Sequence, residues 1–277
     1  MITAQTNLNN FKFDYSISDI ANKIFSNIVK KNIIINEDKF QEILHTLTIF
    51  KDKKFNRCWI AEYLPYWNDI LKQHITNIKS KKIKFLQIGV FEGMSLLYLA
   101  KIIFADYDLD ITVIDDFSTE QYFNTEETFD TNLNDFKIRK IKKDSHTALI
   151  DLINKNETFD FIYCCGSRKP FVVYVDFALL TKVINDNSYI LLDDYQYFSS
   201  YEGDINPDLV KNIFIQSFKR YSKNIPVGQQ NLLIFRKIEI DKYTIKEKQP
   251  DCVNRTTNNK EYEKYKEKYK FIKNNTN

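Results

Sequence analysis

The stretch Phe85-Leu-Gln-Ile-Gly-Val-Phe-Glu-Gly-Met-Ser-Leu-Leu-Tyr-Leu-Ala100 decides the fold predicted for this chain. A short apolar run ending at Ile88 has the composition of a buried strand, and an apolar segment with helical periodicity begins at Ser95. Gly89 and Gly93 join the two segments. Gly89 can take backbone angles closed to other residues, and Gly93 lets the chain approach a ligand closely. In open α/β sheets, a strand that turns through glycines into a helix places a ligand at the carboxyl end of the strand.

The spacing of these glycines differs from that of the common nucleotide-binding loops. The turn lacks the dinucleotide pattern G-x-G-x-x-G, and no G-K-[ST] of a phosphate loop follows it. The second expected strand ends in the acidic pair Asp115 and Asp116, where a carboxylate can accept hydrogen bonds from ribose hydroxyls. A nucleoside held without an anchored pyrophosphate points to S-adenosylmethionine. The alternative is a tight turn that binds no ligand.

Composition excludes several classes of protein. The 277 residues carry 40 Lys and Arg against 37 Asp and Glu, so a net charge of +3 gives no general electrostatic case for nucleic acid. No run of 18 apolar residues and no apolar signal core in residues 1–10 are found, so we expect a cytoplasmic protein without membrane contact. The four cysteines lack metal-ligand spacing and fit a reduced, intracellular setting. The abundance of Asn, Lys and Ile indicates an A+T-rich genome.

The chain alternates strand and helix patterns between two flanking regions. We expect a helical extension over 1–80, an α/β domain over 81–238 and a charged tail, partly helical or disordered, over 239–277. Strands are predicted at 84–88, 111–115, 136–141, 159–164, 188–193 and 231–236, and helices at 94–105, 145–154, 170–184 and 207–221. This pattern predicts a Rossmann-like, doubly wound, mostly parallel seven-stranded sheet. The last strand is expected to be antiparallel, because no helix precedes it.

Aromatic side chains are dense just before the first strand. Trp59, Tyr63, Tyr66 and Trp67 lie within one short stretch of the helical extension. We expect them to pack the extension against the sheet, and an aromatic lid over a ligand is the alternative.

Seven segments, in order, resemble the class I S-adenosylmethionine-dependent methyltransferases. The likeness is to bacterial and viral members whose sheet reads LEIG-FEG-S, then an acidic second strand, then FDFIYIDGSH, then GG-I-DDY. The matching segments are Trp67–Leu71, Phe85–Ser95, Val113–Phe117, Phe129–Leu133, Lys143–Leu149, Phe159–Ser167 and Ile190–Tyr195. The resemblance covers residues 57 to 237. Because the family has viral members, a viral protein is one of the possibilities.

This resemblance implies S-adenosylmethionine as the cofactor and a set of residues around it. One group would shape the loop on the methionine side, Asp115 would hold the ribose, and a pair after the third strand would contact the adenine. The implied residues are Gln87, Gly89, Phe91, Glu92, Gly93, Ser95, Asp115, Asp116, Asp144 and Ser145. Asp144 also fits the N-cap of the following helix, and the two roles can coexist.

The catalytic half departs from the family pattern. Where the family has Asp at the end of the fourth strand and His three positions later, this chain has Cys165 and Arg168. Sugar O-methyltransferases of similar layout use that Asp, with an acidic pair after the fifth strand, to hold a divalent cation that lowers the pKa of the acceptor hydroxyls. Asp193 and Asp194 remain here, and Cys165 stands in the third ligand position. Mg²⁺ would be held weakly, because a thiol is a poor ligand for a hard cation.

These features predict methyl transfer to an oxygen of a sugar or another small polyhydroxylated acceptor. Asp194 is the candidate base, with Asp193 beside it or on a weakly held metal. A positive group near the mouth could attract an anionic substrate such as a nucleotide-linked sugar, and it consists of Arg168, Arg139 and Lys142. The alternative is a catalytically degenerate relative that acts as a binding or scaffold module, which the missing Asp at position 165 favours. A nicotinamide-dependent enzyme is a third reading. The sequence leaves the oligomeric state open, a homo-oligomer included.

Overall fold

The computed structural model describes residue 26 and residues 37–118, 124–193, 195, 206–219 and 221–235. The chain divides into two compact units, Met1–Lys237 and Ile238–Asn277, and every described residue belongs to the first. The expected tail over 239–277 and the candidate base Asp194 lie outside the described residues.

Seven strands form one sheet in the order β3-β2-β1-β4-β5-β7-β6. Their bounds are β1 (Lys82–Ile88), β2 (Asp108–Ile114), β3 (Ile138–Ile141), β4 (Phe159–Cys164), β5 (Ile184–Leu192), β6 (Ser222–Val227) and β7 (Gln230–Phe235). The first five strands are parallel, and β7 runs antiparallel to both β5 and β6. The predicted seven-stranded, mostly parallel sheet with an antiparallel last strand is therefore confirmed. Strand order reverses between β1 and β4, where open sheets bind their ligands beyond the carboxyl ends.

Strand β6 was not among the predicted strands. It reads Ser-Lys-Asn-Ile-Pro-Val and lies at the edge of the sheet. An edge strand tolerates polar side chains and a proline, since one side of its backbone needs no partner strand. The apolar pattern that reveals the inner strands is consequently weak here.

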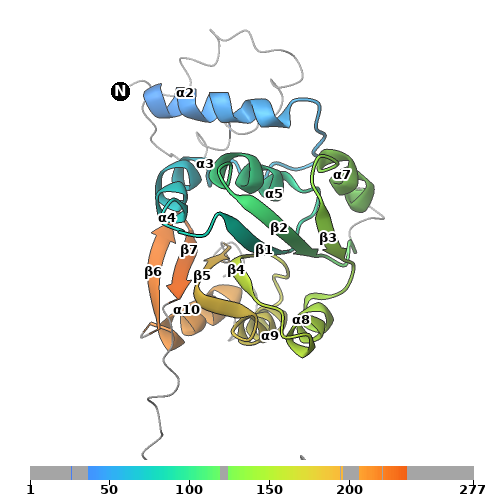
Figure 1. The fold of residues 1–277 in the computed structure, drawn as a ribbon, viewed down its shortest axis with the longest axis vertical. Coiled ribbons are helices and arrows are strands. Elements are labelled where there is room, and N and C mark those ends of the chain that lie inside the picture. The colour runs from blue at the N-terminus through green and yellow to red at the C-terminus, as the bar shows by residue number, and fades with distance from the viewer. Residues whose placement is uncertain are drawn as a thin grey trace, which may run out of the picture. The chain divides into compact units, whose positions relative to one another are not determined.

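Helices cover both faces of the sheet (Figure 1). On one face lie α8, α9 and α10, and on the other lie α5, α7 and the helices that precede β1. The bounds are α2 (Glu37–Thr46), η2 (Leu47–Phe50), α3 (Leu64–Tyr66), η3 (Trp67–Leu71), α4 (Lys72–Ile75), α5 (Met94–Tyr98), η4 (Leu99–Ile103), α7 (Thr125–Asn132), α8 (Ser145–Asn154), α9 (Pro170–Leu180) and α10 (Pro207–Ser217). Helix α7 was missed, because its sequence TEETFDTN carries few apolar residues.

The helices before β1 share one apolar core with the sheet. Leu47, Trp67 and Leu71 are fully buried beside Phe85 of β1 and Tyr98 of α5. Burying each side chain of this size contributes roughly 1.5–3 kcal/mol. The Tyr98 hydroxyl is hydrogen-bonded to Asn68 Oδ1 at 2.7 Å and to Thr46 Oγ1 at 3.0 Å, and burial raises the pKa of Tyr98 to about 12. Residues 43–75 are therefore part of the fold that supports the sheet.

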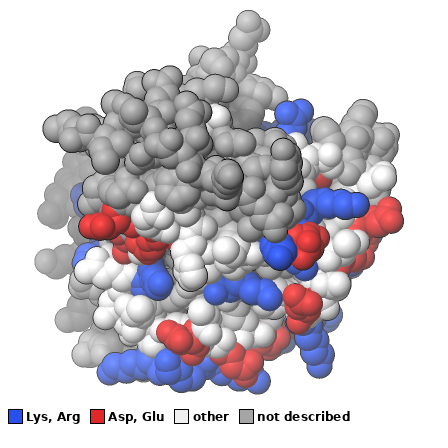
Figure 2. All heavy atoms as spheres, turned by 90° about the horizontal axis from the view of Figure 1, so that it is seen from above, with Lys and Arg blue, Asp and Glu red and all other residues white. Residues whose placement is uncertain are grey.

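Charged side chains of both signs are mixed over the described surface. Figure 2 shows Lys and Arg beside Asp and Glu on one face. Lys140 and Lys142, for example, both pair with Glu126. None of the described helices combines the length and the apolar composition that a bilayer crossing requires.

Candidate functional site at the carboxyl ends of the strands

The loops after β1 and β4 touch where the strand order reverses. Gly89 donates its N–H to Ile114 O at 2.8 Å, and Cys165 donates its N–H to Ile88 O at 2.9 Å. Gly89 has φ +78°, and a Cβ there would lie 2.7 Å from both Cys165 O and Gly166 Cα. Backbone atoms cannot move aside cheaply, so only glycine fits at position 89.

Asp115 holds the turn after β1 through its carboxylate. Oδ2 accepts the N–H groups of Val90 at 2.8 Å and Phe91 at 3.1 Å, and Oδ1 accepts the N–H of Phe117 at 2.8 Å. Phe91 and Phe117 have φ of 49° and 51°, a costly conformation for residues with side chains that these bonds help to maintain. A carboxylate has about four acceptor positions, so room for one more donor remains. The ribose contact of Asp115, and the cofactor contact of exposed Asp116, stay predictions.

Glu92 and Gly93 connect the turn to other parts of the protein. Glu92 is 1% exposed, and its carboxylate accepts the backbone and side-chain N–H groups of Asn56. A Cβ on Gly93 would lie 2.7 Å from Leu133 Cδ1, so its close approach is to the residue that ends α7. The structure therefore gives both residues a role in packing, and their contact with a cofactor stays a prediction.

Gln87 and Ser95 meet beneath the turn. The fully buried Gln87 donates from Nε2 to Ser95 Oγ at 2.8 Å and to Gly89 O at 3.0 Å. Its Oε1 is buried and lacks a hydrogen-bond partner among the described residues. A buried acceptor in this state costs roughly 1–3 kcal/mol, which a donor brought by a ligand would offset.

Asp144 and Ser145, which follow β3, make their hydrogen bonds at the start of helix α8. Asp144 Oδ1 accepts the N–H of Thr147 at 2.9 Å, so the expected N-cap is confirmed, and this bond lowers the pKa of Asp144. Ser145 Oγ donates to Asp176 Oδ2 of α9 at 2.9 Å, and burial raises the pKa of Asp176 to about 6. His146 Nε2 lies 3.5 Å from Asp176 Oδ1. Adenine contact by Asp144 and Ser145 stays a prediction.

Asp193 follows β5 and is only 4% exposed. Its Oδ2 accepts a short hydrogen bond from Arg168 Nη2. Its Oδ1 accepts from Gln230 Nε2 at 2.7 Å and from the Tyr163 hydroxyl at 3.2 Å. Gln230 in turn accepts from Trp67 Nε1 at 2.7 Å. The carboxylate predicted to be catalytic or to bind a metal is thus already engaged by three side chains.

Cys164, the last residue of β4, and Cys165, which follows it, are held as neutral thiols. Cys165 Sγ donates to Gly89 O at 2.8 Å, and burial raises the pKa of Cys165 well above its usual value. Burial likewise raises the pKa of the neighbouring Cys164. A buried thiol of this kind is neither a nucleophile nor a ligand for Mg²⁺ at neutral pH.

The aromatic cluster before β1 divides into two roles. Trp67, Tyr63 and Tyr66 pack inside or against the core, as predicted. Trp59 is 61% exposed and contacts Phe91 of the turn, with ring centroids 4.7 Å apart. Trp59 is therefore the residue of this cluster that suits the predicted alternative of a lid.

Sequence reasoning missed two polar residues that hold the site. Gln230 lies at the start of the last strand and Asn56 in a loop before the first, and neither has a motif around it. The sequence offered one signal for Gln230: if Trp67 is buried, its indole N–H needs a hydrogen-bond acceptor somewhere in the chain.

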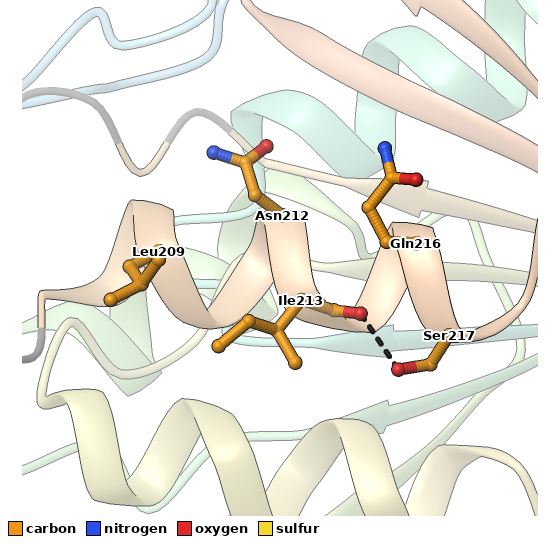
Figure 3. A pocket seen from close by; sticks show the side chains of 5 residues that line it. All are labelled: Leu209, Asn212, Ile213, Gln216 and Ser217. Atoms are coloured by element: carbon orange, nitrogen blue, oxygen red, sulfur yellow. Dashed lines mark hydrogen bonds between the residues drawn. The ribbon is translucent and has the colours of Figure 1, made fainter.

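A surface hollow lies away from these strand ends. It has a volume of about 520 Å³ and is formed on the outer face of α10 (Figure 3). It is lined by Leu209, Asn212, Ile213, Gln216 and Ser217. The lining includes no predicted site residue and no ionisable side chain.

Comparison with known proteins supports one family. Residues 86–195 match the model of a family described as a methyltransferase domain. The matched segment runs from β1 to Tyr195, so it contains the glycine turn, Asp115, Asp144, Arg168 and Asp193. No curated protein matches the chain.

Solved structures similar to this chain include three at low identity. An O-methyltransferase from Bacillus cereus in complex with SAH has 12% identity and a TM-score of 0.48, covering 76% of this chain and 96% of its own. The MycE methyltransferase of the mycinamycin biosynthetic pathway, in complex with Mg and SAH, has 17% identity and a TM-score of 0.46, with coverages of 69% and 54%. Fibrillarin from Methanococcus jannaschii has 11% identity and a TM-score of 0.42, with coverages of 57% and 67%. Likeness at this level carries no information on the acceptor.

Proposed function

We propose that this protein binds S-adenosylmethionine and transfers its methyl group to an oxygen of a small polyhydroxylated acceptor, such as a sugar or nucleotide sugar. The observation that carries the proposal is the glycine turn at the reversal of strand order, inside a segment that matches a methyltransferase family. The buried Gln87 Oε1, which lacks a partner, and the acceptor position left on Asp115 fit a ligand that brings hydrogen-bond donors. When bound, the cofactor supplies a methyl group on a sulfonium sulfur.

The residues of this chain would align the acceptor and take its proton. Asp194 follows Asp193 directly, and we assign it the role of base on its sequence position. Asp193 is neutralised by Arg168 and is buried, so it serves as a fixed support beside the acceptor. Trp59 and Phe91 would cover the turn and exclude water from it.

Calorimetric titration of the purified chain with S-adenosylhomocysteine tests the cofactor part. We expect saturable binding, and Asp115→Asn is expected to weaken it about tenfold or more, because a hydrogen bond to a charged group contributes roughly 1.5–3 kcal/mol. Asp110→Asn, an exposed aspartate near the other end of β2, is the matched control and should bind as the wild type does. Absence of binding at millimolar ligand would contradict the proposal.

A second function is favoured by one observation. Cys165 is held as a neutral thiol and Asp193 is engaged by Arg168, which fits a relative that keeps the fold as a binding or scaffold module. Turnover of S-adenosylmethionine with a panel of sugars and nucleotide sugars separates the two. Formation of S-adenosylhomocysteine above the Asp194→Asn background eliminates the second function.

A further inference from the structure

Two positions after β4 carry different chemistry here from the resembled family, and one of them, that of Cys165, would supply an Asp ligand to the divalent cation in the sugar O-methyltransferases. Cys165 directs its thiol at Gly89 O, and Arg168 directs its guanidinium at Asp193. Asp and His are therefore replaced by a neutral sulfur donor and a permanent cation. The residues present do not fit Mg²⁺, because a hard cation needs several oxygen ligands.

Arg168 is fixed from two sides. Its guanidinium pairs with the Asp193 carboxylate, whose side chain is 6% exposed, and it lies over the Tyr195 ring with Cζ 4.8 Å from the centroid. Both contacts strengthen where water is excluded. The planar fork of Arg makes such a pair specific in direction as well as in charge.

The acceptor positions of Asp193 are largely used within the protein. Gln230 and Tyr163 donate to Oδ1 while Arg168 donates to Oδ2. Gln230 is itself oriented by Trp67, so the network reaches into the helices before β1. A divalent cation at Asp193 would have to displace the half-buried guanidinium of Arg168 and break these bonds.

From this arrangement we infer that the Arg168 guanidinium takes the place of the divalent cation, so that this end of the sheet binds no Mg²⁺ or Mn²⁺. For catalysis the inference rests on the proposed function, and it then makes methyl transfer independent of metal. Arg168 supplies one fixed positive charge beside the acceptor, where a divalent cation would supply two. Asp193 becomes its structural counterion rather than a metal ligand.

Metal titration of the full chain, stripped with EDTA, tests the inference by calorimetry and by melting. We expect no saturable Mn²⁺ or Mg²⁺ binding to the wild type and no shift in Tm. The double variant Cys165→Asp/Arg168→His is expected to gain Mn²⁺ affinity by about tenfold or more over the wild type. Saturable binding to the wild type that Asp193→Asn abolishes would overturn the inference, and so would a double variant that folds without gaining affinity.

A second measurement keeps the inference testable if the double variant does not fold. Arg168→Ala leaves Asp193 buried without its cation and is expected to lower Tm on the order of 10 °C, whereas Arg168→Lys keeps the charge but loses the planar fork and should lower Tm by a smaller amount. Arg139→Ala, which breaks the more exposed pair with Glu157, is the control, with an expected loss under about 3 °C. Equal losses for Arg168→Ala and Arg139→Ala would overturn the inference.

The same samples separate this inference from the proposed function. S-adenosylhomocysteine binding without Mn²⁺ binding supports both. S-adenosylhomocysteine binding together with Mn²⁺ binding at Asp193 removes the inference and leaves the function. Absence of both removes the function alone.

Discussion

Carboxylates at the ends of β1 and β2 hold the main chain, whereas the carboxylate at the end of β5 is held by side chains. Asp115 and Glu92 accept backbone N–H groups from the turn and from Asn56. Asp193 instead accepts from Arg168, Gln230 and Tyr163. We call the turn after β1, with Asp115 and Glu92, the first half of the site, and Asp193 with its three partners the second half. A backbone N–H is present whatever the residue, whereas a side-chain donor is lost when that residue is substituted, so the second half depends more on particular side chains.

The largest expected effect lies in the first half, at Gly89. Gly89→Ala places a Cβ 2.7 Å from backbone atoms at a φ of +78°, so we expect a loss of about 3–5 kcal/mol or failure to fold. Gly166→Ala, whose nearest contact is the Ile88 side chain at 3.2 Å, is the control and should lose less than about 1.5 kcal/mol. Chemical denaturation of both variants measures the difference.

Glu92 tests whether the first half depends on its carboxylates. Glu92→Ala removes a buried carboxylate and its two hydrogen bonds with the exposed Asn56, so we expect a loss of about 2–3 kcal/mol. Hydrogen exchange at the Asn56 amide should quicken, since this bond protects it. Glu127→Ala on the exposed side of α7 should stay within about 0.5 kcal/mol of the wild type. A Glu92 variant as stable as the Glu127 variant would remove the distinction between the two halves.

In the second half, Gln230 is the residue to change. Gln230→Leu removes one partner from Asp193 and one from Trp67, with an expected loss of about 2–3 kcal/mol. Trp67→Phe in the Gln230→Leu background should cost less than it does in the wild type, because the shared bond is already gone. Additive losses in this double-mutant cycle would mean that the bond contributes nothing.

The smallest expected effect is a gain in stability on changing Asp176, which lies in helix α9. Burial raises the pKa of Asp176 from 3.8 to about 6, so the folded protein binds a proton that the unfolded chain releases. This contribution is present below pH 3.8 and is lost as the pH rises through 6. Asp176→Asn should therefore be about 2 kcal/mol more stable than the wild type at pH 8, with little difference near pH 4. Urea denaturation across this range measures it, and equal pH dependence of both proteins would contradict the pKa.

The sequence predicted the inner strands and the glycine turn because each leaves a local pattern. Apolar runs of strand length revealed β1, β2, β4, β5 and β7, and helix α8 was predicted at its observed bounds. Edge strand β6 and helix α7 escaped, because a polar edge and a short acidic helix have little apolar periodicity. Their place is set by tertiary contacts instead.

The sequence predicted where the site residues lie along the strands, but not which residues they contact. Asp115, Asp144 and Asp193 all lie at strand ends as expected, and Asp144 accepts from the nearby Thr147, but the directions of the Asp115 and Asp193 carboxylates depend on donors that are distant in sequence. The replacement of Asp by Cys165 and of His by Arg168 was visible in the sequence. That Arg168 pairs with Asp193 was not, since 25 residues separate them.

The bond between Trp67 and Gln230 joins residues 163 positions apart, across most of the described chain. Strand β7, which carries Gln230, is inserted between β5 and β6 although it is made last. During synthesis, the indole of Trp67 and the carboxylate of Asp193 must therefore wait for the final strand before their bonding is complete. Contacts of such separation slow folding, so the nascent chain passes through a stage in which this end of the sheet is assembled last.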